Sequence, residues 1–481
     1  MLIREIILLF HLIIFISLFS GCAKNDRDIP DIPADTSHDG DTNYDPRISD
    51  TYDQISDITY SALWGPYNLH DPSIIKYGEY YYIYSTDVAY GDNLRCGIMV
   101  RKSKDLVHWT FMGWVFNGIP AIPLQFMTTN QPGYQQLSLW APCIIKAGDK
   151  LRLYYSVPGN NGLKLACIGL ATSDAPEGPW TDEGIVLSCY PDDPYNAIDP
   201  SVIIDGQNGR HWMSYGSYEE GIYMVELDPL TGKRLNAGDL GHRVAYRTER
   251  HDAIEGSEIF YSPDQNMYYL FVSYDWLEDN YNVRVGRSEK PEGPYYDIRG
   301  ADMAGVGDNY PMITARYRFS NHSGWQGVGH NTAIAEGDSA FFISQGRLGS
   351  NKYFMDLHAR RMVFTPDGWP AVSPERYAAV PQDTITASDL TGPWEHIELL
   401  STGSMNTSVS IRLMADGSVS GMENSTWNYE QGLLTLSFSN NQEVFRARVF
   451  REWDWENKKL TIVYTGLTAE GLTCWGKKTS T

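Results

Sequence analysis

Residues 199–204 read Asp-Pro-Ser-Val-Ile-Ile, and they are followed by a polar turn with two glycines at 205–209 and by the apolar stretch 211–215. β-Branched and aromatic runs separated by such a turn predict a β-strand, a tight turn and a second, antiparallel strand. A carboxylate, Asp199, stands at the very start of the first strand. This pair of strands is the unit from which the fold of the chain is inferred.

Four other stretches repeat the same pattern of strand, turn and strand. They begin at Asp71, Ala141, Glu255 and His330. Together with Asp199 they recur every roughly 55 to 75 residues, a spacing that predicts an array of repeated β-units. Units of this length fit a propeller of four-stranded blades.

Aligning the five copies places Asp71, Ala141, Asp199, Glu255 and His330 at one equivalent position. The innermost strand of a propeller blade faces the central axis, so these positions are expected to form a ring at one mouth of the channel. Because side chains alternate along a strand, the residues two positions after the ring residues should share their strand face. They are Ser73, Cys143, Ser201, Ser257 and Thr332. Glu258 should lie on the opposite strand face.

Three carboxylates and one imidazole therefore converge on one predicted ring. A single Asp-Pro-Ser at a strand start is explained by an Asx-type turn, but three aligned acids are not. A cluster of like charges is costly unless it has a task or a partner. Cleavage of a glycosidic bond needs one carboxyl group that stays protonated and a second that is ionised. The ring offers Asp71, Asp199 and Glu255 for these roles.

The composition agrees with an all-β chain and narrows the class of ligand. Of 481 residues 13% are aromatic, with 32 Tyr, and 43 are Gly, as expected for short strands joined by tight turns. The formal net charge of −22 argues against nucleic acid and against an anionic membrane surface as ligands, since both require basic patches. Cys143 is expected to be a small core residue and not a nucleophile.

The N-terminal part of the chain predicts export and a lipid anchor. Residues 1–21 combine Arg4 with an apolar run of signal-peptide length. Ser20-Gly21-Cys22 resembles a bacterial lipoprotein processing box, so Cys22 is the predicted lipidation site; an ordinary secreted signal peptide is the alternative. Residues 22–60 are predicted to be a flexible acidic tether. We expect a protein of the cell envelope, held to a bacterial membrane through the lipid alone.

Two folded domains are predicted after the tether. Residues 61–378 contain the five copies and form the catalytic propeller. Residues 379–481 show short alternating strands at 408–413, 433–438, 443–450 and 459–464 and predict a small antiparallel β-barrel. The barrel contains no cluster of reactive side chains, and we expect its tryptophans to pack in its core and at interfaces.

The chain resembles the family 43 glycoside hydrolases, and within them the larger endo-acting 1,5-α-L-arabinanases with a C-terminal β-barrel. The resemblance covers about residues 61–480, with the motifs in order and plausibly spaced. They are His70-Asp71-Pro72-Ser73, Leu139-Trp140-Ala141-Pro142, the stretch 196–202, Ile254-Glu255-Gly256, Gly329-His330-Asn331 and the stretch 369–377. The resemblance implies a five-bladed β-propeller and an inverting mechanism.

The resemblance also implies a role for each ring residue. Asp71 would be the general base, Glu255 the general acid, and Asp199 the residue that orients the acid and tunes its pKa. His330 would help to hold one calcium ion, mostly hydrated, on the propeller axis. The sugar is expected to be bound by His70, Trp140, Asn196 and Ser217.

The resemblance implies an inverting hydrolase of α-1,5-linked arabinan that cleaves within the chain, and we expect it to be a monomer. The sequence departs from the family pattern at Cys143, at 158–162, at 218–221 and at 344–347. None of these departures touches the three acids, so we expect them to change the shape of the cleft and not the ability to hydrolyse. An exo-acting arabinanase or an α-L-arabinofuranosidase is therefore an alternative. A surface lipoprotein that binds glycan without cleaving it is an alternative of another class. A retaining fructan hydrolase is disfavoured, because its expected Trp-Asn-Asp-Pro and Arg-Asp-Pro signatures are absent.

Overall fold

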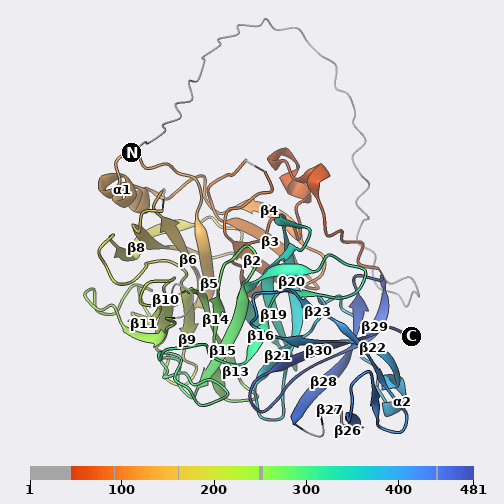
Figure 1. Ribbon diagram of the computed structural model, residues 1–481. Helices are drawn as coiled ribbons and strands as arrows, with labels where there is room; N and C mark the ends of the chain where they lie inside the picture. The colour runs from red at the N-terminus through yellow and green to blue at the C-terminus, as the bar shows by residue number, and fades with distance from the viewer. Residues whose placement is uncertain (1–44, 92, 161, 249–252, 440–441, 481) are drawn as a thin grey trace, which may run out of the picture. The chain divides into compact units, whose positions relative to one another are not determined.

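The structure is a computed structural model that describes residues 45–91, 93–160, 162–248, 253–439 and 442–480 (Figure 1). The predicted signal peptide, the lipidation site Cys22 and the tether up to residue 44 lie outside the described residues. Within the described residues no helix has the length and apolar character needed to cross a membrane.

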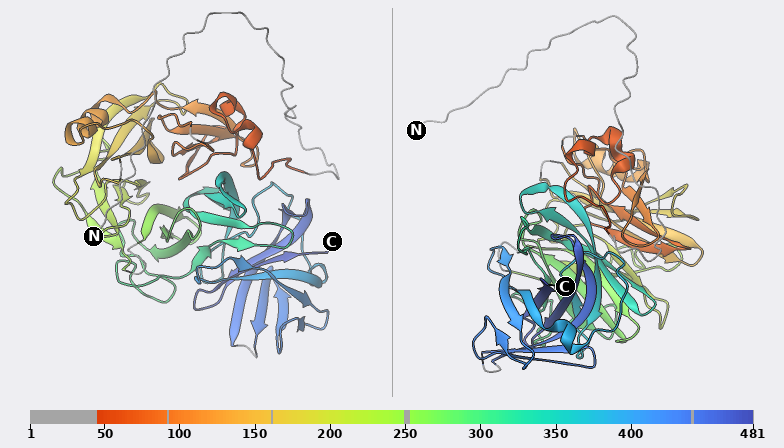
Figure 2. Two further views of the ribbon diagram at one scale, coloured as in Figure 1. Left: turned by 45° about the horizontal axis from the view of Figure 1, so that its top comes forward. Right: turned by 90° about the vertical axis from the view of Figure 1, so that its right-hand side faces the viewer.

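Five antiparallel sheets, following one another along the chain, form the blades of a propeller (Figures 1 and 2). Blade 1 contains β1 (Ser73–Tyr77), β2 (Tyr80–Ser85), β3 (Met99–Ser103) and β4 (Thr110–Trp114). Blade 2 contains β5 (Trp140–Ala147), β6 (Lys150–Pro158), β7 (Ala166–Ser173) and β8 (Thr181–Cys189). Blade 3 contains β9 (Ser201–Ile204), β10 (His211–Tyr215), β11 (Ile222–Leu227) and β12 (His242–Ala245).

The last two blades follow the same order of strands. Blade 4 contains β13 (Ile254–Ser262), β14 (Met267–Tyr274), β15 (Asn282–Ser288) and β16 (Met312–Thr314). Blade 5 contains β18 (Trp325–Glu336), β19 (Ser339–Leu348), β20 (Asn351–Phe364) and β21 (Pro370–Val372), with β17 (Tyr317–Arg318) paired to β18. The second strand of a blade is covered on both faces by the neighbouring blades, so it is almost wholly buried and reads as a continuous apolar run. The predicted five-bladed propeller is confirmed.

The innermost strands β1, β5, β9, β13 and β18 lie next to one another in a closed circle. On each of them one side chain accepts a hydrogen bond from a backbone N–H of the next blade. The five bonds run from Ile144 N to Ser73 Oγ (3.0 Å), Val202 N to Cys143 Sγ (3.2 Å), Ile259 N to Ser201 Oγ (3.2 Å), Ala333 N to Glu258 Oε1 (3.2 Å) and Ile74 N to Thr332 Oγ1 (3.4 Å). This circuit fixes the register of the blades around the axis.

The circuit corrects the alignment of the fourth copy. The prediction paired Ser257 with Ser73 and put Glu258 on the opposite strand face, which is wrong. The register shift after Glu255 in β13 matches the one after Trp140 in β5, so Glu255 corresponds to Trp140, Gly256 to the ring residue Ala141, and Glu258 to Cys143. Glu258 therefore takes the place that Ser73 has in blade 1 and accepts bonds from Ser201 Oγ (2.7 Å) and Thr332 Oγ1 (2.9 Å).

The predicted tether ends earlier than expected. Residues from about 48 to 69 pack against blade 5 and close the seam between the last and the first blade. Leu357 N donates to Pro66 O (2.8 Å) and Leu69 N to Met355 O (3.2 Å). The buried Tyr52 donates to Asn68 Oδ1 (2.8 Å) and packs among the apolar side chains of the seam.

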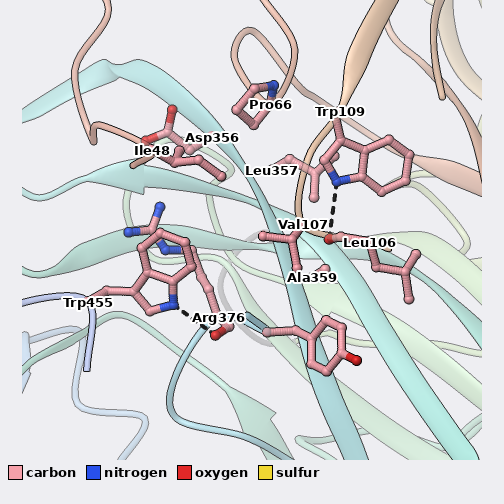
Figure 3. Close-up of a pocket in the computed structure, with 11 residues that line it drawn as sticks. Ile48, Pro66, Leu106, Val107, Trp109, Asp356, Leu357, Ala359, Arg376 and Trp455 are labelled. Carbon is pink, nitrogen blue, oxygen red and sulfur yellow. Dashed lines mark hydrogen bonds between the residues drawn. The ribbon is translucent and has the colours of Figure 1, made fainter. Parts of the chain in front are cut away.

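A small pocket lies where this seam meets the C-terminal domain (Figure 3). Pro66 and Trp109 line it from the side of blade 1 and Leu357 from blade 5. Trp455 closes it from the C-terminal domain and donates from Nε1 to Arg376 O (2.8 Å), as Figure 3 shows. The pocket contains none of the predicted catalytic residues, so it belongs to the junction between the domains.

The C-terminal domain is a nearly closed barrel of eight strands. In sheet order they are β25 (Val419–Ser420), β24 (Val409–Leu413), β22 (Gly392–Leu399), β30 (Thr473–Lys478), β29 (Lys459–Leu467), β28 (Glu443–Asp454), β27 (Leu433–Phe438) and β26 (Thr426–Glu430). A bridge between Ser418 and Thr426 brings the two ends of this sheet together. β23 (Asn406–Thr407) instead pairs with β17 of blade 5, so backbone hydrogen bonds tie the barrel to the propeller. The predicted barrel is confirmed.

Helical segments are few and short. They are η1 (Asp53–Ile55), η2 (Ile58–Leu63), α1 (Ala121–Asn130) and α2 (Ala387–Leu390). α1 lies between blades 1 and 2, and the sequence analysis did not predict it. Its residues show no helical alternation of apolar and polar side chains, so the usual signal of a surface helix is missing.

A buried cluster of charges joins the two domains. Lys477 Nζ lies 2.9 Å from Glu375 Oε1, 2.9 Å from Asp454 Oδ1 and 2.5 Å from Glu456 Oε2, and all four side chains are almost completely buried. Glu375 follows blade 5, whereas the other three residues belong to the barrel. One ammonium group thus compensates carboxylates from both domains.

Replacing Lys477 by Met should destabilise the protein by about 3–5 kcal/mol, because removing one partner of a buried ion pair leaves the others uncompensated. Urea unfolding of wild type and variant measures the loss. Lys104→Met is the matched control, since Lys104 is exposed and lies 3.7 Å from Glu79 at the surface, where an ion pair adds little. Equal midpoints for Lys477→Met and wild type would contradict this account of the junction.

Candidate active site

The predicted ring residues do meet at one mouth of the propeller, and their backbone geometry is special. Asp71, Ala141, Asp199 and His330 have positive φ angles of 49°, 27°, 57° and 46°. Residues other than glycine rarely adopt this conformation, which costs of order 1–3 kcal/mol and is found most often at functional sites. In blade 4 the equivalent residue is Gly256 (φ 60°), so Glu255 precedes the ring position by one residue.

Side chains from the second strand of the preceding blade hold this conformation. Ala141 N donates to Thr86 Oγ1 (2.7 Å), Asp199 N to Ser156 Oγ (3.0 Å), His330 N to Ser273 Oγ (2.7 Å) and Asp71 N to Gln345 Oε1 (3.1 Å). The sequence analysis missed these four residues. A recurring Ser at the end of the predicted second strands marks two of them, Ser156 and Ser273, but in blades 1 and 5 the contact is made by Thr86 and Gln345, one residue after Ser85 and Ser344.

Asp71 lies in a strongly cationic environment. His330 Nδ1 is 2.9 Å from Asp71 Oδ1, and His70 Nδ1 is 2.7 Å from Asp71 Oδ2. Thr86 Oγ1 donates to Asp71 Oδ2 (2.6 Å). Burial alone would raise the pKa of Asp71, but the two imidazoles outweigh it and hold this pKa well below its ordinary value. Asp71 is therefore a carboxylate at neutral pH, as a general base must be.

Asp199 has the opposite character. It is buried, and its Oδ2 accepts a hydrogen bond from Gly256 N (3.2 Å), the residue after Glu255. Burial and the nearby carboxylates of Glu255 and Asp71 raise the pKa of Asp199 to about 7, against the lowering effect of His330. Two carboxyl groups of the same ring thus differ in pKa, which is lowered for Asp71 and raised for Asp199.

Glu255 is partly exposed at the mouth, and both of its oxygens are bonded. Ser217 Oγ donates to Oε2 (2.8 Å) and Tyr281 OH to Oε1 (2.6 Å). The two hydroxyl groups fix the orientation of the carboxyl group and would stabilise the carboxylate that remains after it gives up a proton. Ser217 was predicted as a sugar ligand, and the structure places it on Glu255. Tyr281 was missed, because the corresponding residues before the third strand of blades 1 to 3, Ile98, Leu165 and Gly221, carry no hydroxyl group that would mark the position.

The remaining predicted sugar ligands lie around the ring. His70 is buried beside Asp71, and its Nε2 has no hydrogen-bond partner within the protein. Trp140 precedes the ring residue Ala141, is 39% exposed, and is oriented by a bond from Nε1 to Ser138 Oγ (2.7 Å). Asn196 lies three residues before Asp199, in contact with Cys189 Sγ (3.8 Å). An exposed indole and an imidazole with a free Nε2 are side chains that suit a sugar site.

His330 is the predicted ligand of a calcium ion. Calcium prefers six to eight oxygen ligands. Among the described residues the one group of at least three His, Cys, Asp or Glu close enough to share an ion is Glu375, Asp454 and Glu456, which already surrounds Lys477. His330 offers only Nε2, because its Nδ1 contacts Asp71. Among the described residues, His330 therefore offers one nitrogen, and the ring offers no closed cage of side-chain ligands for an ion.

Cys143 is one of the five free cysteines among the described residues. Its Sγ accepts the hydrogen bond from Val202 N in the circuit of inner strands, and burial raises its thiol pKa well above the ordinary value. A protonated thiol that is already bonded is a poor nucleophile. The prediction that Cys143 is a packing residue agrees with this position.

Sequence comparisons assign both domains. Residues 65–370 match the family described as glycosyl hydrolases family 43, and residues 374–476 match its C-terminal lipocalin-like domain. The extracellular endo-α-(1→5)-L-arabinanase of Thermotoga petrophila is 30% identical over 452 residues, which cover 85% of this chain and 93% of that protein. An extracellular exo-α-(1→5)-L-arabinofuranosidase of Cellvibrio japonicus is 30% identical over 63% of this chain and 86% of its own length.

Solved structures agree with the sequence comparisons. The crystal structure of the endo-1,5-α-L-arabinanase from Thermotoga petrophila has a TM-score of 0.77 and 28% identity, covering 87% of this chain and 99% of that chain. The α-L-arabinanase of Cellvibrio cellulosa complexed with arabinohexaose has a TM-score of 0.55 and 27% identity, covering 64% of this chain and 96% of that chain. The family profile spans most of the propeller and includes every predicted catalytic residue. This chain belongs to family 43 of the glycosyl hydrolases.

Proposed function

We propose that the protein hydrolyses α-1,5-L-arabinofuranosidic bonds within arabinan. The observation that carries the proposal is the ring at the propeller mouth, where a strongly ionised Asp71, a high-pKa Asp199 and a bonded Glu255 lie together in a family 43 chain. Two carboxyl groups with separate tasks are the minimum for glycoside hydrolysis. Relatives named as arabinanases support arabinan as the substrate.

In the proposed mechanism Asp71 takes a proton from a water molecule, which attacks the anomeric carbon in one step. Glu255 donates its proton to the leaving oxygen on the opposite side of the sugar ring, so the configuration of that carbon inverts. Ser217 and Tyr281 then stabilise the Glu255 carboxylate through their hydroxyl groups. Asp199 anchors the backbone of Gly256 and so positions Glu255.

Endo action is favoured because two relatives that match 85% of the chain, which includes parts of both domains, are named endo-arabinanases. Exo action is the second candidate, because an exo-acting relative is equally identical over the shorter region that it shares. Product analysis of linear arabinan decides between them. A ladder of oligosaccharides from the first minutes supports endo cleavage, and one short product released throughout supports exo cleavage. No new reducing ends despite tight binding of arabinan would favour a glycan-binding protein.

A calcium ion bound to His330 and otherwise to water is part of the proposal. When bound, such an ion supplies positive charge beside the three acids of the ring. Burial lowers the pKa of His330, but contact with Asp71 outweighs it and raises this pKa to about 9. The imidazole is therefore doubly protonated at neutral pH, and a metal ion would have to displace one of the two protons.

Metal analysis tests this part. We expect about one calcium per chain in wild type, loss of the ion in His330→Ala, and a roughly tenfold lower activity after chelation that added calcium restores. Full activity in a sample shown to be free of metal would contradict a role for the ion.

The protein is further proposed to be a monomer tethered to the cell envelope through lipid on Cys22, like its extracellular relatives in acting outside the cytoplasm. Support comes from the apolar leader and the Ser-Gly-Cys box before an acidic, proline-containing segment. Fractionation tests the anchor: wild type should partition with membranes and Cys22→Ser should not. Identical partition of both proteins would contradict it.

A further inference from the structure

A group of polar and aromatic side chains lies outside the catalytic ring on the side of blades 4 and 5. We call Trp276, Glu278, Arg347, Lys352 and Tyr353 the outer cluster. Trp276 and Glu278 belong to the loop between β14 and β15, and the other three belong to the hairpin of β19 and β20. The mechanism proposed above uses none of these residues.

Both segments of the outer cluster start at the catalytic mouth. Ile254, at the start of β13, pairs with Tyr274 at the end of β14, so the loop that follows lies beside Glu255. The same loop supplies Tyr281, which donates to Glu255. On β19, Gln345 binds the backbone of Asp71, and Arg347 follows two residues later on the same strand face. The outer cluster is thus continuous with the ring.

The outer cluster is held in place before any ligand arrives. Trp276 Nε1 donates to Glu278 Oε2 (3.3 Å), and the same oxygen pairs with Lys352 Nζ. Lys352 Nζ lies 5.4 Å above the ring of Tyr353, and Lys352 O accepts a bond from Arg347 Nη1 (2.8 Å). The ion pair of Lys352 with Glu278 thus connects the two aromatic side chains, Trp276 through Glu278 and Tyr353 through Lys352.

The two aromatic rings of the outer cluster are nevertheless largely exposed, and one buried donor has no hydrogen-bond partner. Trp276 is 53% and Tyr353 is 56% exposed, although large aromatic side chains are usually more buried. Arg347 is only 6% exposed, and its buried Nε has no hydrogen-bond partner in the protein. Its guanidinium interacts electrostatically with both Asp71 of the ring and Glu278 of the outer cluster, so it lies between the two groups.

We propose that the outer cluster is a binding subsite for a sugar residue of the arabinan chain, remote from the bond that is cut. The faces of Trp276 and Tyr353 stack against the apolar face of a furanose, and Arg347 and Lys352 bind its hydroxyl groups. Blades 2 and 4 are not adjacent in the ring, so Trp140 and Trp276 engage the chain on two sides of the catalytic acids. This arrangement suits cleavage within a polymer, and the inference rests on the proposed function.

Kinetics of Trp276→Ala on substrates of different length test the subsite. We expect KM for linear arabinan to rise roughly tenfold, the size of effect that loss of one stacked aromatic ring produces, with a much smaller change in kcat. KM for the shortest oligosaccharide that wild type cleaves should rise at least fivefold less, because that substrate does not reach the outer cluster. Trp276→Phe keeps a ring and should fall between wild type and Trp276→Ala.

Tyr296→Ala is the matched control, because Tyr296 is 46% exposed in the same blade but outside the outer cluster, and it should match wild type on both substrates. Equal KM for wild type and Trp276→Ala on arabinan would overturn the subsite and leave the proposed function standing. An equal rise on short and long substrates would also overturn it, since only a general disturbance of the mouth acts in that way. Failure of wild type to cleave arabinan would overturn the proposed function and the subsite together.

Discussion

Glu255→Gln should lower kcat on linear arabinan by about 10²- to 10⁴-fold, the usual contribution of a general acid. The substitution keeps the size of the side chain and its contacts with Ser217 and Tyr281, but it removes the proton that the leaving sugar needs. An arabinofuranoside with an activated aryl leaving group needs little protonation, so its rate should fall far less. Steady-state rates on both substrates measure the difference.

Glu220→Gln is the control for this variant, because Glu220 lies in the loop after β10 and pairs with Arg243 at the surface. It should behave as wild type. An equal loss of rate on the natural and the activated substrate would contradict the role of Glu255 as the acid. A normal rate of Glu255→Gln on arabinan would remove Glu255 from the mechanism.

Asp71→Asn should produce a loss of about 10²- to 10⁴-fold, again with an unchanged fold. An amide cannot take the proton of the attacking water. The loss should be similar for arabinan and for the activated substrate, because water must be activated whatever group leaves. This dependence on the leaving group separates the base Asp71 from the acid Glu255.

Thermal unfolding accompanies the kinetics of Asp71→Asn, because Asp71 also contacts His330 and His70. Asp174→Asn serves as the control, since Asp174 is exposed and pairs with Lys150 at the surface. A much smaller loss on the activated substrate than on arabinan would mean that Asp71 does not act as the base. A folded variant with wild-type rates would exclude it from catalysis.

The repeated strand pairs made the propeller and most of the ring predictable from the sequence. Asp71, Asp199 and His330 occupy equivalent positions, because each stands at the same place in its copy, two residues before the side chain that bonds the next blade. The fourth copy was aligned one residue off, because Gly256 occupies its ring position and the acid Glu255 precedes it. For this reason Glu255 was found but Glu258 was assigned to the wrong strand face.

Residues that hold the ring side chains in place were the ones most often missed. Tyr281 directly precedes the third strand of blade 4, and the residues at that place in blades 1 to 3 are Ile98, Leu165 and Gly221, so the repeat does not mark it. In the barrel the predicted strands at 408–413, 433–438, 443–450 and 459–464 correspond to β24, β27, β28 and β29. The two-residue strand β23 exists only through pairing with the distant β17, which local sequence does not encode. The charge of Lys477 likewise gave no sign that it would be buried among acids.

Proton NMR of an arabinan digest during its first minutes tests the central claim most directly, namely that Asp71 and Glu255 together invert the α-linked sugar. The account predicts that the new reducing ends appear first in the β configuration and reach the equilibrium mixture only later. New ends that appear first in the α configuration, or no new anomeric signals at all, would contradict it.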